Sequence, residues 1–274
     1  MSRLILCASL WSLSAHPSPR REWPMDRKLA AVRAAGFAAV SGPPGIALTA
    51  RAEAHGLHRL GVFIAPDWDA VECGLRDCVT DRVVRVNVQL GTPALTDRAA
   101  CALAVRAWRR AETLGLRLSF ETHRGTCTET PEKLTMLAAG FAQATGRLLP
   151  VTWDFSHHAV VRQVPRAQWS QRLLQERPLI AAADLFHLRP HTPHQVQIPL
   201  SHGLRLTAEA RVWLEFVQAA LQLWRSAPGN TDRELFVCPE MGPCGDYGLA
   251  SSPPAWPEAV RLARHLRSAW RTAA

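Results

Sequence analysis

Eight short apolar segments recur along the chain, and segments with helical periodicity separate them. We interpret the apolar segments as strands, at residues 4–8, 37–40, 58–64, 83–88, 116–121, 151–154, 179–187 and 235–239. We interpret the remaining periodic segments as helices, at residues 25–35, 46–55, from residue 66 onward, 97–114, 131–145, 165–175, 207–225 and 256–270. Short buried strands that alternate with helices are typical of a parallel sheet, because a helix usually makes the crossover between parallel strands.

Eight strand–helix units predict that this sheet closes into a (β/α)8 TIM barrel. Gly36, Gly56 and Gly115 each follow a helical segment directly, as expected where a helix ends. The chain has 274 residues, of which 47% are hydrophobic, and this is enough to bury the core of one barrel. No linker, repeat or low-complexity segment interrupts the alternation, so we expect a single catalytic domain over residues 1–274.

The formal charge of +9 raises the question of a nucleic-acid partner. The charge is mostly arginine spread over all helical segments, and no basic block or aromatic-interleaved basic stripe occurs. We therefore expect no nucleic-acid partner. The two lysines, Lys28 and Lys133, both fall in predicted helices rather than at strand ends, which disfavours a Schiff-base aldolase. No glycine-rich phosphate loop follows a strand, which disfavours nucleotide chemistry.

The seven cysteines are dispersed, odd in number and without a C-x-x-C pair, which suits a reducing compartment rather than a disulfide framework. No apolar run reaches the roughly 18 residues that a membrane-spanning helix needs. Residues 1–15 resemble a weak signal peptide, but their removal would delete the first predicted strand. We expect a cytoplasmic protein that does not associate with a membrane.

Four consecutive strands of the predicted barrel end in a carboxylate or an imidazole, at Glu121, Asp154, His187 and Glu240. The carboxyl ends of barrel strands meet at one mouth, where enzymes of this architecture hold their active sites. Three carboxylates this close would repel one another without a cation between them. Three oxygen ligands and one nitrogen suit Mn²⁺, Mg²⁺ or Co²⁺ better than a structural zinc, with Zn²⁺ as a further option. The sequence therefore predicts one divalent cation at these four side chains.

Each of these residues taken alone has an ordinary structural interpretation. A carboxylate at a strand end is more often a helix cap or an ion-pair partner, and a lone histidine there usually donates a hydrogen bond within a loop. The set is more informative, because all four residues fall at the same end of consecutive strands. Seven of the eleven histidines also lie between residues 121 and 203. This clustering favours a functional site over four separate structural roles.

The order of these residues resembles that of the xylose isomerase-like TIM barrels (the AP endonuclease 2-type barrels), which carry Glu, then Asp-x-x-His, then His, then Glu. That superfamily includes sugar isomerases, ketose 3-epimerases, hydroxypyruvate isomerase, inosose dehydratase and endonuclease IV. Asp154 and His157 match the Asp-x-x-His motif, and the 33 residues from Glu121 to Asp154 are a spacing similar to that of the epimerases. The segments "ETHRGT" and "CPEMGP" are similar to phrases in sugar isomerases and epimerases. The motif match covers residues 116–243.

The resemblance implies that Glu121, Asp154, His187 and Glu240 bind the metal ion. It further implies that Glu121 and Glu240 lie on opposite sides of the substrate and act as acid and base. The expected enzyme is a metal-dependent isomerase or epimerase of a sugar, polyol or sugar-like hydroxy-carbonyl compound. The chemistry is sound, because a cation that chelates a carbonyl and a neighbouring hydroxyl acidifies the adjacent C–H and stabilises the enediolate. A carboxylate held nearby can then take the proton.

Four further residues are predicted to contact the substrate. His157 resembles the residue that contacts a substrate oxygen in the epimerases. Arg189, two positions after His187, carries a guanidinium group that can hold an oxyanion, a carboxylate or a phosphate. Trp11, at the end of the first predicted strand, offers an apolar platform, and His123 is expected to line the pocket.

Other functions remain open at this point. A metal-dependent dehydratase or lyase of a sugar or cyclitol would start from the same enediolate and expel a hydroxyl group. An endonuclease IV-like phosphodiesterase would need extra histidines after the third and fourth strands, which end instead in Ile64-Ala65-Pro66 and Asn87-Val88-Gln89. A degenerate barrel that only binds a ligand is disfavoured by the four intact ligands. Many barrels of this kind self-associate, so a homo-oligomer is a further option.

Overall fold

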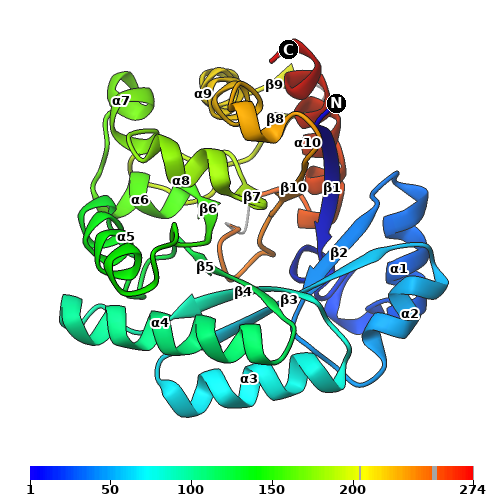
Figure 1. Ribbon diagram of the computed structural model, residues 1–274. Coiled ribbons are helices and arrows are strands. Elements are labelled where there is room, and N and C mark those ends of the chain that lie inside the picture. Colours follow the sequence, from blue (N-terminus) through cyan, green and yellow to red (C-terminus); the bar gives the residue numbers. More distant parts are fainter. Residues whose placement is uncertain (204, 249–251, 274) are drawn as a thin grey trace.

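The computed structural model describes residues 1–203, 205–248 and 252–273. In this part of the chain, eight parallel strands form a closed barrel with helices around it, as Figure 1 shows. The strands follow one another in chain order around the barrel, and β1 closes it by pairing with β10. This arrangement confirms the predicted (β/α)8 TIM barrel. The two ends of the chain lie near each other beside β1 and α10 (Figure 1).

The barrel strands are β1 (Arg3–Ser9), β2 (Ala39–Gly42), β3 (His58–Ala65), β4 (Arg85–Leu90), β5 (Arg117–Glu121), β6 (Val151–Asp154), β7 (Leu185–Leu188) and β10 (Glu234–Pro239). A two-stranded antiparallel hairpin, β8 (Ser201–His202) and β9 (Arg205–Leu206), lies outside the barrel. The register of neighbouring strands brings their carboxyl ends level at the mouth. Asp154 of β6, for example, lies opposite His187 of β7, which in turn lies opposite Cys238 of β10.

The surrounding helices are α1 (Met25–Ala34), α2 (Leu48–Ala54), α3 (Trp68–Thr80), α4 (Asp97–Thr113), α5 (Pro131–Thr145), α6 (Phe155–Val161), α7 (Trp169–Leu173), α8 (Arg177–Ala182), α9 (Ala208–Arg225) and α10 (Ala255–Thr272). Side-chain caps explain several of the starts. Asp67, Thr96, Thr130 and Thr207 each accept a hydrogen bond from a backbone N–H in the first turn of the helix that follows. Pro131 also occupies the first position of α5, where its missing N–H has no consequence.

The strict alternation predicted from the sequence is wrong between β6 and β9. Three helices, α6, α7 and α8, lie between β6 and β7, and the β8–β9 hairpin was not predicted. The strand expected over residues 179–187 begins only at Leu185, because residues 177–182 form α8. Pro178 at the start of α8 is favourable for a helix, and a short apolar run such as "LIAAA" suits either structure locally.

Smaller differences concern element boundaries. The second and fourth strands begin and end two residues later than expected, and the helix expected at residues 46–55 begins at Leu48. The helix expected at residues 165–175 is divided into a 3₁₀ turn, Arg166–Gln168, and α7. These shifts leave the predicted carboxyl-terminal residues Glu121 and Asp154 at the strand ends.

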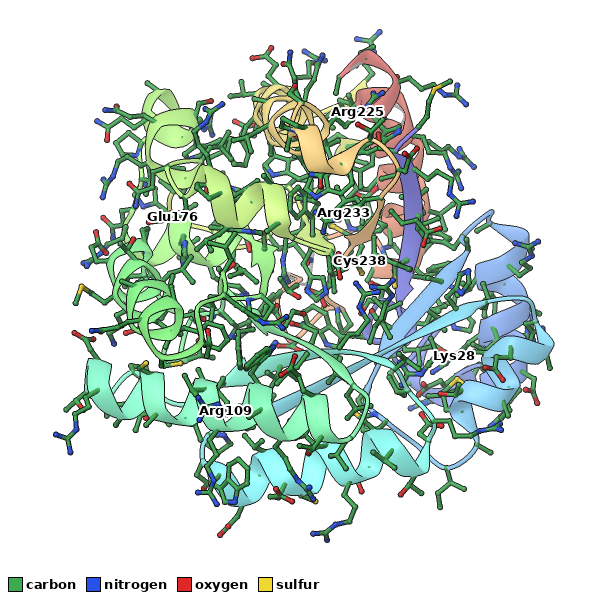
Figure 2. The ribbon with its side chains drawn as sticks, viewed as in Figure 1. Lys28, Arg109, Glu176, Arg225, Arg233 and Cys238 are labelled. Atoms are coloured by element: carbon green, nitrogen blue, oxygen red, sulfur yellow. The ribbon has the colours of Figure 1, made fainter. Side chains whose placement is uncertain are left out.

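Two hydrophobic regions hold the barrel together. The larger one lies between the outer face of the sheet and the helices, and the smaller one fills the barrel interior. The interior cluster consists of Cys7, Ala39, Leu60, Leu185, Phe236 and Cys238. Figure 2 shows Cys238 at the centre of the barrel and Arg109, from α4, in the outer layer of helices. Apolar packing inside the barrel thus holds the strand ends at the mouth in place.

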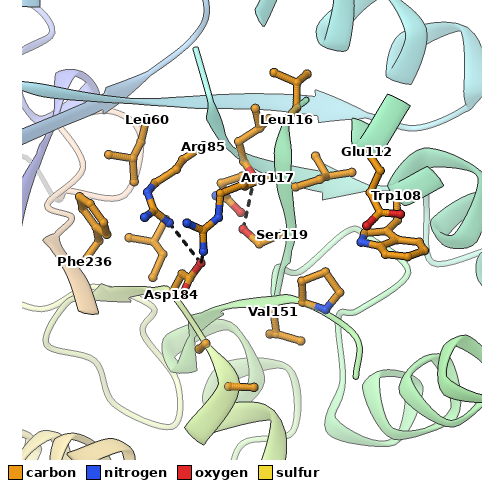
Figure 3. A pocket seen from close by; sticks show the side chains of 17 residues that line it. Leu60, Arg85, Trp108, Glu112, Leu116, Arg117, Ser119, Val151, Asp184 and Phe236 are labelled. Carbon is orange, nitrogen blue, oxygen red and sulfur yellow. Dashed lines mark hydrogen bonds and ion pairs between the residues drawn. The ribbon is translucent and has the colours of Figure 1, made fainter. Parts of the chain in front are cut away.

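The amino-terminal ends of the strands form a separate, polar face. A cavity of about 270 Å³ lies there, lined in part by Arg85, Arg117 and Asp184. Figure 3 shows both guanidinium groups directed at the Asp184 carboxylate. In barrels of this type the amino-terminal face serves stability rather than catalysis. Among the described residues, no helix combines the length and the apolar character that crossing a membrane requires.

Candidate metal centre

The four predicted ligands converge at the carboxyl ends of four neighbouring strands. Glu121 ends β5, Asp154 ends β6, His187 lies in β7 and Glu240 follows β10 directly. One ligand atom from each of these residues lies within 4.8 Å of the others. Glu121, Asp154 and His187 are almost fully buried, whereas Glu240 is partly exposed. Residues that are as much as 119 positions apart in the chain thus form one cluster.

His187 lies between two of the carboxylates. Its Nδ1 atom is 3.2 Å from Glu121 Oε1 and 3.3 Å from Glu240 Oε2. Burial by itself lowers the pKa of His187, but Glu240 and Glu121 hold that pKa well above its ordinary value. Burial raises the pKa of Glu121, but the neighbouring imidazoles, chiefly that of His187, together outweigh burial and lower this pKa to about 2. The carboxylates therefore attract positive charge strongly at this position.

Arg189 supplies positive charge to the same cluster. Its Nη2 atom donates to Asp154 Oδ2 and, at 2.8 Å, to Glu240 Oε2. The other guanidinium nitrogens, Nε and Nη1, are buried and have no hydrogen-bond partner in the described part of the chain. Although burial opposes it, Arg189 keeps the pKa of Asp154 far below its usual range. The substrate-binding role predicted for Arg189 stays a prediction, and the unpaired nitrogens are compatible with it.

The residues present fit a divalent cation. Three carboxylates and one imidazole form a donor set of oxygen with one nitrogen, which suits Mg²⁺, Mn²⁺ or Co²⁺. The cluster is buried, and its negative charge requires a cation in any case, since uncompensated carboxylates are costly at low dielectric. The guanidinium of Arg189 and the imidazole of His187 neutralise part of this negative charge. The arrangement supports the predicted metal site.

Two supporting residues were not predicted from the sequence. Asn87 Nδ2 donates to Glu121 Oε2 at 2.6 Å, and Gln89 Nε2 donates to the same oxygen at 3.1 Å. Both side chains come from β4, where they occupy alternate positions and so point to the barrel interior. Two amides at alternate positions, each followed by an apolar residue, were a usable signal. The two hydrogen bonds orient the Glu121 carboxylate toward the other ligands.

His123 and His157 lie beside the four predicted ligands, and the centroids of their rings are 3.9 Å apart. They form a second group with Glu121 in which one atom of each lies within 4.8 Å of the others. Both nitrogens of His123 already have partners, since Nδ1 is 2.6 Å from the Arg124 carbonyl and Nε2 is 3.3 Å from the Tyr247 hydroxyl. The ring nitrogens of His157 make no hydrogen bond within the described residues. We therefore favour the four-residue cluster as the ion site.

A helix that was not expected from the sequence, α6, begins directly after Asp154. Asp154 caps this helix, because its Oδ1 atom accepts a hydrogen bond from Ser156 N at 3.0 Å. The helix brings His157 back to the site, with Nε2 at 3.4 Å from Asp154 Oδ2. Burial lowers the pKa of His157 well below its ordinary value, which keeps the ring neutral. A neutral imidazole of this kind can donate to or accept from a substrate oxygen.

Trp11 lies in a 3₁₀ turn, Leu10–Leu13, rather than at the end of β1 as expected. Its Nε1 donates to Asp246 Oδ2 at 2.9 Å, and its ring meets Tyr247 edge to face at 5.1 Å. Tyr247 is the only tyrosine in the sequence, and the sequence contained no signal for its position at the mouth. Trp11, Tyr247 and Arg189 all line a cavity of about 830 Å³ that opens above the metal cluster.

Comparisons with known proteins identify the fold. No protein-family model matches the chain, and no curated protein matches it. Solved structures do match. A xylose isomerase-like TIM barrel/4-hydroxyphenylpyruvate dioxygenase fusion protein is similar at a TM-score of 0.64 and 16% identity over 98% of this chain. The match spans 44% of the fusion protein, so the chain corresponds to less than half of that protein.

Further similar structures differ in what they act on or bind. The probable 3-DHS dehydratase AsbF from Bacillus anthracis has a TM-score of 0.60 at 12% identity, over 96% of this chain and 99% of that one. A D-psicose 3-epimerase, crystallised in the presence of D-fructose, has a TM-score of 0.53 at 11% identity, over 98% and 96%. A xylose isomerase-like TIM barrel protein from Mycobacterium smegmatis, in complex with magnesium, has a TM-score of 0.57 at 16% identity, over 97% of each chain. At such identities the likeness establishes the fold alone.

Proposed function

The chain has the xylose isomerase-like TIM-barrel fold, and on this basis we propose that it is a metal-dependent isomerase or epimerase of a sugar or sugar-like hydroxy-carbonyl compound. The observation that carries the proposal is the convergence of Glu121, Asp154, His187 and Glu240 within 4.8 Å at the mouth. Similar structures that include an epimerase and a magnesium complex support it.

In the proposed mechanism, these four residues would hold one divalent ion, Mn²⁺, Mg²⁺ or Co²⁺, with Zn²⁺ as a further option. When bound, the ion would polarise the carbonyl and neighbouring hydroxyl of the substrate and so make the adjacent C–H acidic. Glu240 is partly exposed and lines the cavity, so its carboxylate is placed to take that proton from the substrate. Glu121 is more deeply buried, and in this mechanism it would return a proton from the other side of the substrate.

The surrounding residues would position the substrate and exclude water. Asn87 and Gln89 hold Glu121 Oε2, which leaves Oε1 directed at the site. The neutral ring of His157 would contact a substrate oxygen, and the free Nε and Nη1 donors of Arg189 would hold a second one. Trp11 and His123 line the cavity and would limit the movement of the substrate.

The proposal is tested by metal content and proton exchange. The protein purified with Mn²⁺ should contain close to one ion per chain, measured by elemental analysis. Incubation of that protein in D₂O with a panel of ketoses and simpler α-hydroxyketones should introduce deuterium at the carbon next to the carbonyl. Glu240→Gln should retain the circular-dichroism spectrum and lose the exchange by at least about a hundredfold, since it removes the base. Three ions per chain, or incision of DNA at abasic sites, would instead support a nuclease.

A second candidate function is a metal-dependent dehydratase, which the likeness to the probable 3-DHS dehydratase favours. It would use the same proton removal and then expel a hydroxyl group from the neighbouring carbon. Loss of water from the product, detected by mass spectrometry, distinguishes this reaction from isomerisation or epimerisation.

The remaining parts of the proposal concern the setting of the enzyme. We propose that residues 1–274 act as one catalytic domain. We also propose a cytoplasmic location, which agrees with all seven cysteines being free. Self-association of the barrels is compatible with the proposal and is testable by light scattering.

A further inference from the structure

The cavity of about 830 Å³ is one continuous space with two chemically different ends. At the metal end, Gln89, Arg189 and Glu240 line it. On the β1–β3 side of the mouth, the turn after β1, the first residues of α1 and α2 and the end of β3 contribute a group of side chains that we call the apolar wall: Trp11, Met25, Leu48, Val62 and Ile64. The wall adjoins the metal end, because Ile64 is paired with Gln89 of β4. A ligand large enough to fill the cavity would contact both the charged end and the apolar wall.

The geometry of β3 explains why part of this wall faces the cavity. Side chains alternate along a strand, so Leu60, Val62 and Ile64 lie on the same face. Leu60 belongs to the cluster inside the barrel, which identifies that face as the inner one. Glu121 and Asp154 end β5 and β6, which lie across the barrel from β1 and β2. The mouth is therefore charged on one side and aliphatic on the other.

Ile64 is the clearest sign that the wall receives a ligand. It is 70% exposed although it belongs to a strand of the barrel and lines a cavity. An aliphatic side chain in this position is in contact with water until an apolar group covers it. Covering it releases that water and favours binding of an apolar group over a hydroxylated one.

Trp11 is held in place at the rim of the wall. Asp246 accepts a hydrogen bond from its Nε1, and Tyr247 packs against its edge. The ring also lies against Gly242, where an added Cβ would be 2.3 Å from ring atom Cη2. Glycine at this position allows the loop after β10 to approach the ring. Trp11 thus presents a fixed aromatic surface, which costs a ligand little ordering on binding.

A polyhydroxylated substrate would find few partners at this end. Among the described residues that line this part of the cavity, the polar side chains are Ser9, Ser14 and Lys28, together with Asp246 and Tyr247 from the loop after β10. Asp246 already accepts the hydrogen bond from Trp11. Lys28 is nearly buried and already paired with Glu22. Hydroxyl groups placed against the apolar wall would lose their hydrogen bonds to water without replacement.

We propose that the substrate carries an apolar body, aromatic or alicyclic, next to the hydroxy-carbonyl group that reaches the metal centre. The far end of the substrate is then not a chain of hydroxylated carbons. This inference rests on the proposed function, because it takes the charged end of the cavity as the reactive one.

Binding of matched metal-chelating probes tests the proposal. Lactate, gluconate and 3-phenyllactate share an α-hydroxy carboxylate and the same charge, and they differ in the attached body. Their dissociation constants on the Mn²⁺-loaded protein can be measured by isothermal titration calorimetry. We expect 3-phenyllactate to bind at least about tenfold more tightly than lactate or gluconate.

Two isoleucine variants locate the effect. Ile64→Ser should weaken 3-phenyllactate binding by about threefold or more and change lactate binding by less than about twofold, because only the body contacts the wall. Ile46→Ser is the matched control, since Ile46 is also exposed but does not line the cavity. It should leave all three dissociation constants unchanged.

The outcomes separate this inference from the function on which it rests. Gluconate binding as tightly as 3-phenyllactate would overturn the apolar body and leave the metal site intact. A preference for 3-phenyllactate that Ile64→Ser does not reduce would overturn the assignment to the apolar wall. Failure of lactate, gluconate and 3-phenyllactate alike to bind the Mn²⁺ form would overturn both the inference and the proposed metal-dependent reaction.

Discussion

Single side chains at the mouth serve both the fold and the candidate site. Asp154 Oδ1 accepts hydrogen bonds from Ser156 N and Oγ and caps α6, while Oδ2 faces Arg189 and His157. The two interpretations of a carboxylate at a strand end, helix cap and ligand, therefore do not exclude each other, because a carboxylate has two oxygens. Glu121 is similar, with one oxygen held by β4 amides and the other directed at His187.

His158 provides a prediction about pH. It is fully buried and its Nε2 lies 2.8 Å from the Thr128 carbonyl, and burial lowers its pKa to about 4. The folded pKa is below the ordinary value of 6.5, so the unfolded chain takes up the proton first as the pH falls. The stability that the neutral, buried form of His158 provides is therefore complete above pH 6.5, and it is lost as the pH falls from 6.5 to about 4. For the metal-free protein, we expect this residue to lower the free energy of unfolding by about 2 kcal/mol from pH 7 to pH 5.

Urea unfolding at pH 7, 6 and 5 measures this effect. His158→Gln keeps a donor near the Thr128 carbonyl but does not titrate, so its free energy of unfolding should fall less steeply with decreasing pH. An equal slope in the two proteins would contradict the assignment to His158.

At the level of elements, the side chain of Thr122 links the ends of β5 and β6, just beyond the last paired residues of these two strands. Thr122 follows β5, and its Oγ1 accepts from Asp154 N at 2.8 Å and donates to Asp154 O at 3.0 Å. The hydroxyl is fully buried and extends the pairing of the two strands by one residue. It thereby sets the position of Asp154 relative to Glu121.

Thr122→Val tests this role, because valine has nearly the same shape and lacks the hydroxyl. We expect a loss of about 1–3 kcal/mol in the free energy of unfolding, since two buried backbone groups of Asp154 lose their partner. Mn²⁺ affinity should fall about tenfold as the ligand shifts, measured by calorimetry. Thr122→Ser keeps the hydroxyl and should bind Mn²⁺ nearly as the parent does. Equal Mn²⁺ affinity in the valine and serine variants would argue against a positioning role.

In the molecule as a whole, the two ends of the barrel differ in the residues that they hold. The carboxyl end holds the acidic cluster and the 830 Å³ cavity, and the interior cluster of apolar residues separates it from the amino end. At the amino end, Asp184 accepts hydrogen bonds from Arg85 at 3.2 Å, Arg117 at 2.9 Å and Arg233 at 2.8 Å. These residues lie at or next to the starts of β4, β5, β7 and β10, so the contacts join half of the barrel.

Asp184→Asn should therefore reduce stability without affecting the site. We expect a loss of about 1–3 kcal/mol in the free energy of unfolding, because three neighbouring arginines would lose their shared counter-charge. The loss should be smaller in high salt, since Asp184 is one-third exposed. Mn²⁺ affinity should not change. Asp232→Asn, which removes a highly exposed carboxylate, is the matched control and should have little effect. A changed Mn²⁺ affinity in Asp184→Asn would mean that the two ends are coupled.

The eight barrel strands and the convergence of Glu121, Asp154, His187 and Glu240 at one mouth were predictable from the chain, although the order of elements between β6 and β9 was not. Apolar runs and helical periods indicate the elements, and strand ends in a barrel meet whatever the loops do. Local patterns did not decide that residues 177–182 form α8, because the run suits either a helix or a strand. They also did not reveal that Arg189 pairs with Asp154 and Glu240, or that Asn87 and Gln89 support Glu121. Those contacts, like the apolar wall opposite the acidic cluster, depend on the register and closure of the barrel, which bring distant side chains within hydrogen-bonding or packing distance.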